Sequence, residues 1–194
     1  TSTVSNNTGS SNIAIGCEAA PNLSNGKYNI LFGTYVAGSS AAISGCDNVF
    51  LGTAAGSSLT SGDYNILLGF NAGLSLTNCD RNIFIGKEAG KCNDGDDNIL
   101  LGQDAGKGSP TVADNTGDNN VFIGKDSGKE IVTGARNVFL GCQAGRCNTC
   151  ASDNVFIGTQ AGANSTGGGS SPTRTMAIGT QAGQYMCGGC TVPM

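Results

Sequence analysis

The chain has 194 residues, of which 32 are glycine and 9 are cysteine, and it contains neither histidine nor tryptophan. The lack of histidine excludes histidine-dependent catalytic triads, imidazole acid–base chemistry and histidine metal ligands. A net charge of −4, with only 10 basic residues, argues against a nucleic-acid partner. Uninterrupted apolar runs are too short to cross a bilayer, so we expect no membrane span.

A five-residue motif, asparagine followed by three apolar residues and glycine, recurs ten times. Five of the nine intervals between copies are 17 residues long, and the others are 16 to 22. A second glycine usually follows the first after four residues, commonly as Ala-Gly. A unit of this length cannot bury a face alone, so the repetition indicates a solenoid of stacked coils. The motif begins at Asn12, Asn29, Asn48, Asn65, Asn82, Asn98, Asn120, Asn137, Asn154 and, with threonine in place of asparagine, at Thr175.

The β-branched and aromatic residues of the motif predict a short strand that its glycine ends. The fold expected is all-β: a parallel β-roll or β-helix solenoid of about ten coils of roughly 17 residues. We expect a lead-in at 1–11, the repeat domain at 12–186 and a cysteine-containing tail at 187–194. A further apolar position six residues before the asparagine predicts a second short strand per coil, at Leu23, Leu59, Leu76 and Ile131.

The asparagines form a column in register along the coils. Their amides are expected to hydrogen-bond between neighbouring coils and to satisfy backbone groups at the turn, as in the amide ladders of stacked β structures. The alternative is a ligand site. The column comprises Asn12, Asn29, Asn48, Asn65, Asn82, Asn98, Asn120, Asn137 and Asn154.

Both sides of the predicted strand are apolar, although a coil has only one interior. If the first and third apolar residues fill it, the middle residues form an exposed stripe larger than a soluble monomer tolerates. That stripe predicts self-association, and the alternative is a wide single-chain solenoid whose own loops cover it. The expected interface residues are Leu31, Phe50, Leu67, Phe84, Leu100, Phe122, Phe139 and Phe156.

The strands Asn12–Gly16 and Met176–Gly179 resemble the Val-Ala-Ile-Gly strand of the head repeat in trimeric autotransporter adhesins. The Gly-x-x-Ala-Gly continuation is similar to the Asn-x-Phe-x-Gly-x-x-Ala-Gly arrays of tail-fibre and related adhesive trimer proteins of phages, viruses and bacteria. The resemblance covers residues 9 to about 184. It implies a homotrimer of left-handed parallel β-rolls around a common axis, with fibre-building or surface-binding activity. The repeat here is longer than in the head family, and phenylalanine replaces its small middle residue.

Nine cysteines favour an oxidising, extracellular setting or a virion or cell surface. Disulfides that staple loops are one interpretation, and free thiols or a Cys₄ zinc site are the alternatives. Cys79 and Cys92, in neighbouring turns, are one candidate pair between coils. The candidates are Cys79, Cys92, Cys147, Cys150, Cys187 and Cys190, the last four forming two Cys-x-x-Cys pairs.

Other motifs are weaker. The oxygen-rich segments 93–98 and 114–118 suggest Ca²⁺ loops or solvated turns, and no other cofactor is expected. Insertions at 107–119 and 163–174 are either binding loops or tolerated surface loops. Glycosylation sequons occur at Asn6, Asn22 and Asn164.

Turn carboxylates such as Glu88 and Asp104 show no sign of a pocket, so we expect no catalytic residues and no enzyme. The sequence favours an extracellular structural or adhesive fibre module that partners with itself and with a cell-surface or host receptor. A filament-forming matrix or appendage protein and a cysteine-rich metal-binding protein are the alternatives. Because the chain begins with Thr1, we interpret it as a processed product or a fragment.

Overall fold

The computed structural model describes residues 9–38, 42–110, 116–150, 152–164 and 173–185. The strands of this part are all three residues long, and it contains no helix. They are β1 (Ile13–Ile15), β2 (Ile30–Phe32), β3 (Val49–Leu51), β4 (Ile66–Leu68), β5 (Ile83–Ile85), β6 (Ile99–Leu101), β7 (Val121–Ile123), β8 (Val138–Leu140), β9 (Val155–Ile157) and β10 (Met176–Ile178).

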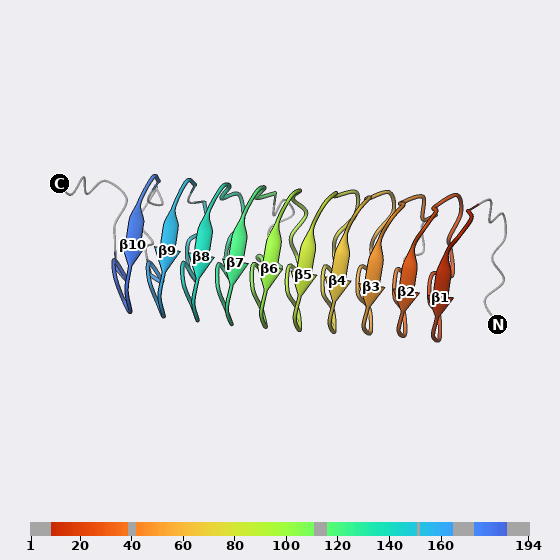
Figure 1. Cartoon of the computed structure of the whole chain (residues 1–194), viewed down its shortest axis with the longest axis horizontal. Coiled ribbons are helices and arrows are strands. Elements are labelled where there is room, and N and C mark those ends of the chain that lie inside the picture. The colour runs from red at the N-terminus through yellow and green to blue at the C-terminus, as the bar shows by residue number, and fades with distance from the viewer. Residues whose placement is uncertain (1–8, 39–41, 111–115, 151, 165–172, 186–194) are drawn as a thin grey trace.

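The strands form a single parallel sheet in chain order from β1 to β10. Each strand pairs with the next one in register, so that Leu31 lies beside Phe50 and Phe50 beside Leu67. The chain winds once between successive strands, and Figure 1 shows the resulting row of coils, with β1 and β10 at opposite ends. The predicted all-β parallel solenoid is therefore confirmed.

The middle residue of the strand points into the coil, opposite to the expectation from the sequence. Phe50, Phe84, Phe122, Phe139 and Phe156 are fully buried, as are Leu31, Leu67 and Leu100. Ring stacking fills the interior of the later coils, with centroids 4.7 Å apart for Phe122 and Phe139 and 5.0 Å for Phe139 and Phe156. The predicted interface stripe is wrong, because all eight of its residues belong to the core.

Small residues across the coil make room for this large middle side chain. A Cβ atom placed on Gly56 would lie 2.5 Å from the Phe50 ring, and one on Gly145 would lie 2.4 Å from the Phe139 ring. The alanine before each of these glycines, Ala55 or Ala144, is fully buried. The Ala-Gly pair of the repeat is therefore the packing surface for the phenylalanine ring.

The second apolar position of the repeat also faces inward. Leu23, Leu59, Leu76 and Ile131 are buried, but the described part of the chain has no second strand at these positions. A single isolated bridge joins Leu23 to Ile43 there. The backbone at this corner still bonds from coil to coil, as when Ser58 N–H donates to Leu74 O at 3.1 Å and Thr60 N–H to Thr77 O at 2.8 Å, without forming a strand. The prediction of a second short strand is therefore wrong, and these four residues instead form a second apolar column in the core.

Candidate functional site

The asparagine column forms a continuous ladder inside the corner that precedes each strand. Asn48 donates its backbone N–H and its Nδ2 to Oδ1 of Asn29, both at 3.0 Å, and Nδ2 also donates to Gly62 O at 2.8 Å. The same bonds recur from Asn120 to Asn154. Buried amides that satisfy one another and the turn stabilise the stack of coils. At the last coil, Thr175 N–H donates to Asn154 Oδ1 at 2.9 Å.

The ladder has one defect, at the shortest coil. Asn98 lies only 16 residues after Asn82, and Asn98 N–H still donates to Asn82 Oδ1 at 2.9 Å. Asn82 Nδ2, however, is buried and has no hydrogen-bond partner. This coil therefore contributes less hydrogen bonding than its neighbours do.

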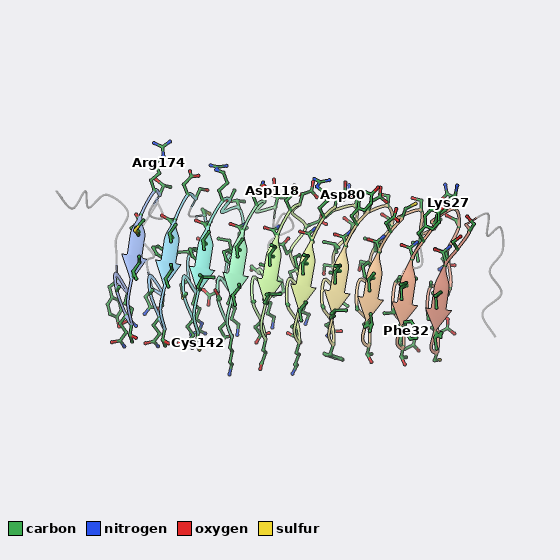
Figure 2. All side chains as sticks on the ribbon, viewed as in Figure 1. Lys27, Phe32, Asp80, Asp118, Cys142 and Arg174 are labelled. Carbon is green, nitrogen blue, oxygen red and sulfur yellow. The ribbon has the colours of Figure 1, made fainter. Side chains whose placement is uncertain are left out.

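A second ladder, which the sequence reasoning missed, runs beside the first along the same corner. Asp63, Asp80, Asp96 and Asp118 lie two residues before their asparagines, and each accepts a backbone N–H from the preceding coil at 2.7–2.9 Å. Figure 2 shows Asp80 and Asp118 on this long edge together with Lys27 and Arg174. The signal available in the sequence was an aspartate at this position in four consecutive repeats.

Ion pairs continue the same edge. Arg81 contacts Asp97 in the next coil through two hydrogen bonds of 2.6 and 2.9 Å, and Arg136 contacts Asp153 in the same way at 2.6 and 3.0 Å. The arginine in each pair holds the pKa of its aspartate below the usual range. These four residues have φ between 57° and 61°, a left-handed conformation that is uncommon for arginine and better tolerated by aspartate.

A charged ladder lies at the corner that follows the strand. Lys107 bridges Glu88 and Asp104, and Lys129 bridges Asp104 and Asp126. Lys107 lowers the pKa of Glu88. Burial raises the pKa of Asp104, but Lys107 and Lys129 outweigh this effect and hold it below its usual value. Farther along the column the ladder becomes neutral, because Gln160 donates to Gln143 and Gln181 donates to Gln160, at 2.9 and 3.0 Å.

The outer side of the sheet carries ten of the fifteen large hydrophobic side chains that are exposed among the described residues. It consists of the first and third residues of every strand, and we call it the outward face. Ten of its large side chains are exposed by between 36% (Ile66) and 71% (Met176) of their surface. They are Ile13, Ile15, Ile30, Phe32, Leu51, Ile66, Ile85, Ile123, Met176 and Ile178.

The described cysteines are free thiols: Cys17, Cys46, Cys79, Cys92, Cys142, Cys147 and Cys150. The proposed pairing of Cys79 with Cys92 is wrong, because the two occupy different corners of their coils. Cys79 stands three residues before Asn82, where its Sγ donates to Asp94 Oδ1 at 2.9 Å. Cys92 N–H bonds instead to Lys107 O. Cys147 and Cys150 likewise form no disulfide, and Cys187 and Cys190 lie outside the described residues.

The segment 93–98 directs its oxygen atoms to the preceding coil. Asp94 accepts from Thr77 and Cys79, Asp96 accepts from Asp80 N–H, and Asp97 pairs with Arg81. Among the described residues, no three cysteine, aspartate or glutamate side chains are grouped as metal ligands. Parts of the other Ca²⁺ candidate, 114–118, and of the insertions at 107–119 and 163–174 lie outside the described ranges.

Of the three sequons, Asn22 is exposed, while Asn164 is half-buried and its Oδ1 accepts a hydrogen bond from Cys147 Sγ. Asn6 lies outside the described ranges. Where the structure describes the chain, it contains no helix that could cross a bilayer. Comparisons of the chain with protein-family models, curated proteins and solved structures gave no match.

Proposed function

We propose that the chain is a non-enzymatic structural and adhesive rod module of an extracellular, virion or cell surface, and that copies of it associate through the outward face. The observation that supports this function is the outward face itself. It presents ten partly exposed large side chains in two parallel rows, and a contiguous apolar patch of this kind marks a site of interaction in a soluble protein.

The interior supports the mechanical half of the proposal. The asparagine ladder and the phenylalanine stack connect each coil to the next through buried groups. Because every coil bonds to its neighbours in the same way, bending would break many contacts at once. The module therefore acts as a stiff spacer.

A second copy is the simplest occupant of the outward face. A closed ring of identical subunits buries the same face on each copy, and a homotrimer around a common axis is the arrangement that the adhesin-like repeats imply. The side chains of the face are apolar and uncharged, as in the cores of permanent interfaces, from which charged residues are depleted. In this arrangement the two charged edges remain in solvent, where they are available to a surface or receptor.

Light scattering on matched variants tests this assembly. Ile85→Lys and Ile123→Lys each place a charge on the outward face, whereas Ser61→Lys adds the same charge at an exposed turn residue. We expect the wild type and Ser61→Lys to have the mass of a trimer, and both isoleucine variants to dissociate while keeping their β circular dichroism. A wild type that stays monomeric at every concentration contradicts the proposal.

A filament is the second candidate, because β1 and β10 are the two end strands of the sheet among the described residues and an open strand edge can recruit another chain. Electron microscopy separates the two candidates. Discrete rods support the closed module, and indefinite filaments support end-to-end assembly.

A further inference from the structure

Two tyrosines stand in line on the edge that carries the aspartate ladder. Tyr28 and Tyr64 directly precede Asn29 and Asn65, and they are 58% and 61% exposed. Their backbone N–H groups bond to equivalent carbonyls of the preceding coils, Ser10 O and Cys46 O, and Asp47 occupies the same position in the coil between them. Since coils are ~4.8 Å apart, the two tyrosines are separated by about 10 Å along the edge.

These positions are unfavourable for a tyrosine. Both residues have φ of 59°, which costs a residue with a Cβ atom about 1–2 kcal/mol. At the same position Arg81 and Arg136 each gain a two-bond ion pair with the next coil. The tyrosine side chains are about as exposed as these arginines but form no such ion pair. Because other residues at this position, such as Arg81, also have a positive φ, it is the alignment of two exposed rings on one edge that points to a binding role.

We propose that Tyr28, Asp47 and Tyr64 form a binding edge for an extended, neutral, β-linked glycan. One sugar ring stacks on each tyrosine, and Asp47 accepts hydrogen bonds from the hydroxyl groups of the sugar between them. In an extended β-linked chain each sugar advances by about the rise of one coil. Alternate sugars therefore present the same face at the spacing of the two tyrosines. The inference gives a ligand class to the adhesive part of the proposed function and rests on that part.

The charge of the region favours a neutral ligand. Lys27, Asp47 and Asp63 surround the tyrosines, and beyond them Arg81 is neutralised by Asp97. A net charge of −4 disfavours nucleic acid. Aromatic rings with a polar tip match a sugar, which has an apolar C–H face and a polar rim.

Isothermal titration with cellohexaose, chitohexaose and the α-linked maltohexaose tests the proposal. We expect one of the β-linked probes to bind and maltohexaose, which curves, to bind at least tenfold more weakly. Tyr28→Ala and Tyr64→Ala should each weaken binding by about tenfold, the loss of one stacked ring. The matched control is Tyr35→Ala, which removes a tyrosine with φ of 55° and 54% exposure from the other corner and should change nothing.

A register variant tests the spacing itself. The double substitution Asp47→Tyr with Tyr64→Asp keeps two tyrosines on the edge but places them in adjacent coils, so binding should fall as far as in Tyr64→Ala. Binding to none of the probes, an equal loss in Tyr35→Ala, or unchanged affinity in the register variant would overturn the proposal. Light scattering on the same variants measures their oligomeric state independently of the titration. A failure of self-association is thereby distinguished from a failure of glycan binding.

Discussion

Asn137 Oδ1 accepts two hydrogen bonds from Asn154 in the next coil, from the backbone N–H at 3.0 Å and from Nδ2 at 3.1 Å. Both side chains are fully buried. The oxygen therefore satisfies two donors that would otherwise be buried without partners, and the same relationship is repeated along the rod.

The ladder predicts unequal costs for two otherwise identical substitutions. Asn137→Ala removes side-chain bonds on both of its sides and should lower the free energy of unfolding by about 3 kcal/mol or more, at about 1 kcal/mol for each bond. Asn82→Ala removes the bond to Asn98 N–H and an amide nitrogen that is already unpaired, so about 1 kcal/mol is expected. Urea denaturation measures both values, and equal losses would contradict the ladder.

The orientation of the strand predicts which apolar residues support each coil. Phe139→Ala empties a fully buried, stacked position and should cost about 3–5 kcal/mol. Its neighbour Val138 faces outward and is half-buried, so Val138→Ala should cost about 1 kcal/mol or less in the dissociated chain. Thermal unfolding of the two variants in an Ile85→Lys background makes this comparison. A larger loss of stability in Val138→Ala than in Phe139→Ala would contradict this orientation and support a core filled by the first and third strand residues.

Asn148 is a site where a substitution should stabilise the protein. It occupies the inner column that Leu59, Leu76 and Ile131 fill in other coils, and it is fully buried. Its Nδ2 donates to Gly162 O at 2.9 Å, but its Oδ1 has no partner, and the cost of that buried oxygen together with the apolar burial that leucine adds exceeds the value of the one bond lost. Asn148→Leu should raise the free energy of unfolding by about 1 kcal/mol. Asn93 is the matched control, because its Oδ1 accepts Gly95 N–H at 3.0 Å, and Asn93→Leu should destabilise. Equal shifts in melting temperature would show that the unpaired oxygen costs nothing.

The charged corner predicts an acid-sensitive stability. The pKa values of Glu88 and Asp104 are lowered in the folded chain, so their contribution to stability is fully present above their ordinary pKa values and is lost as the pH falls through the lowered folded values. The pKa values of Lys107 and Lys129 are raised, which keeps the lysines charged up to about pH 10. Melting temperature measured against pH should fall in acid, and Glu88→Gln should flatten that fall. An unchanged acid slope would contradict this role.

The thiols should differ in reactivity. Burial, together with the hydrogen bond to Asp94, raises the pKa of Cys79 well above its usual value, so this thiol stays protonated and protected at pH 8. Cys142 is exposed on the opposite edge (Figure 2). Iodoacetamide followed by mass spectrometry should label Cys142 in the folded chain and Cys79 only after unfolding. Rapid labelling of Cys79 would contradict its placement.

Repetition made much of the fold predictable. Ten copies of Asn-apolar-apolar-apolar-Gly located all ten strands to within a residue of their bounds, and the registered asparagines predicted the amide ladder. The aspartate ladder was missed because an aspartate before an asparagine looks like an ordinary solvated turn. The ladder forms only because the neighbouring coil places a backbone N–H within reach of each carboxylate, as Asp63 N–H donates to Asp80 Oδ1.

The sequence by itself determined two features. The spacing of the motif requires a parallel solenoid, and the composition of its strand makes both sides of that strand apolar, although the coil has only one interior. Only the tertiary structure decided which side is inside. A strand of three apolar residues, such as Val138–Leu140, has no polar side to mark its exterior. The choice depends on how the corners direct the strand and on where small residues leave space. Gly145 admits the ring of Phe139, and this fit between residues on opposite walls of the coil sets the outward face and everything proposed for it.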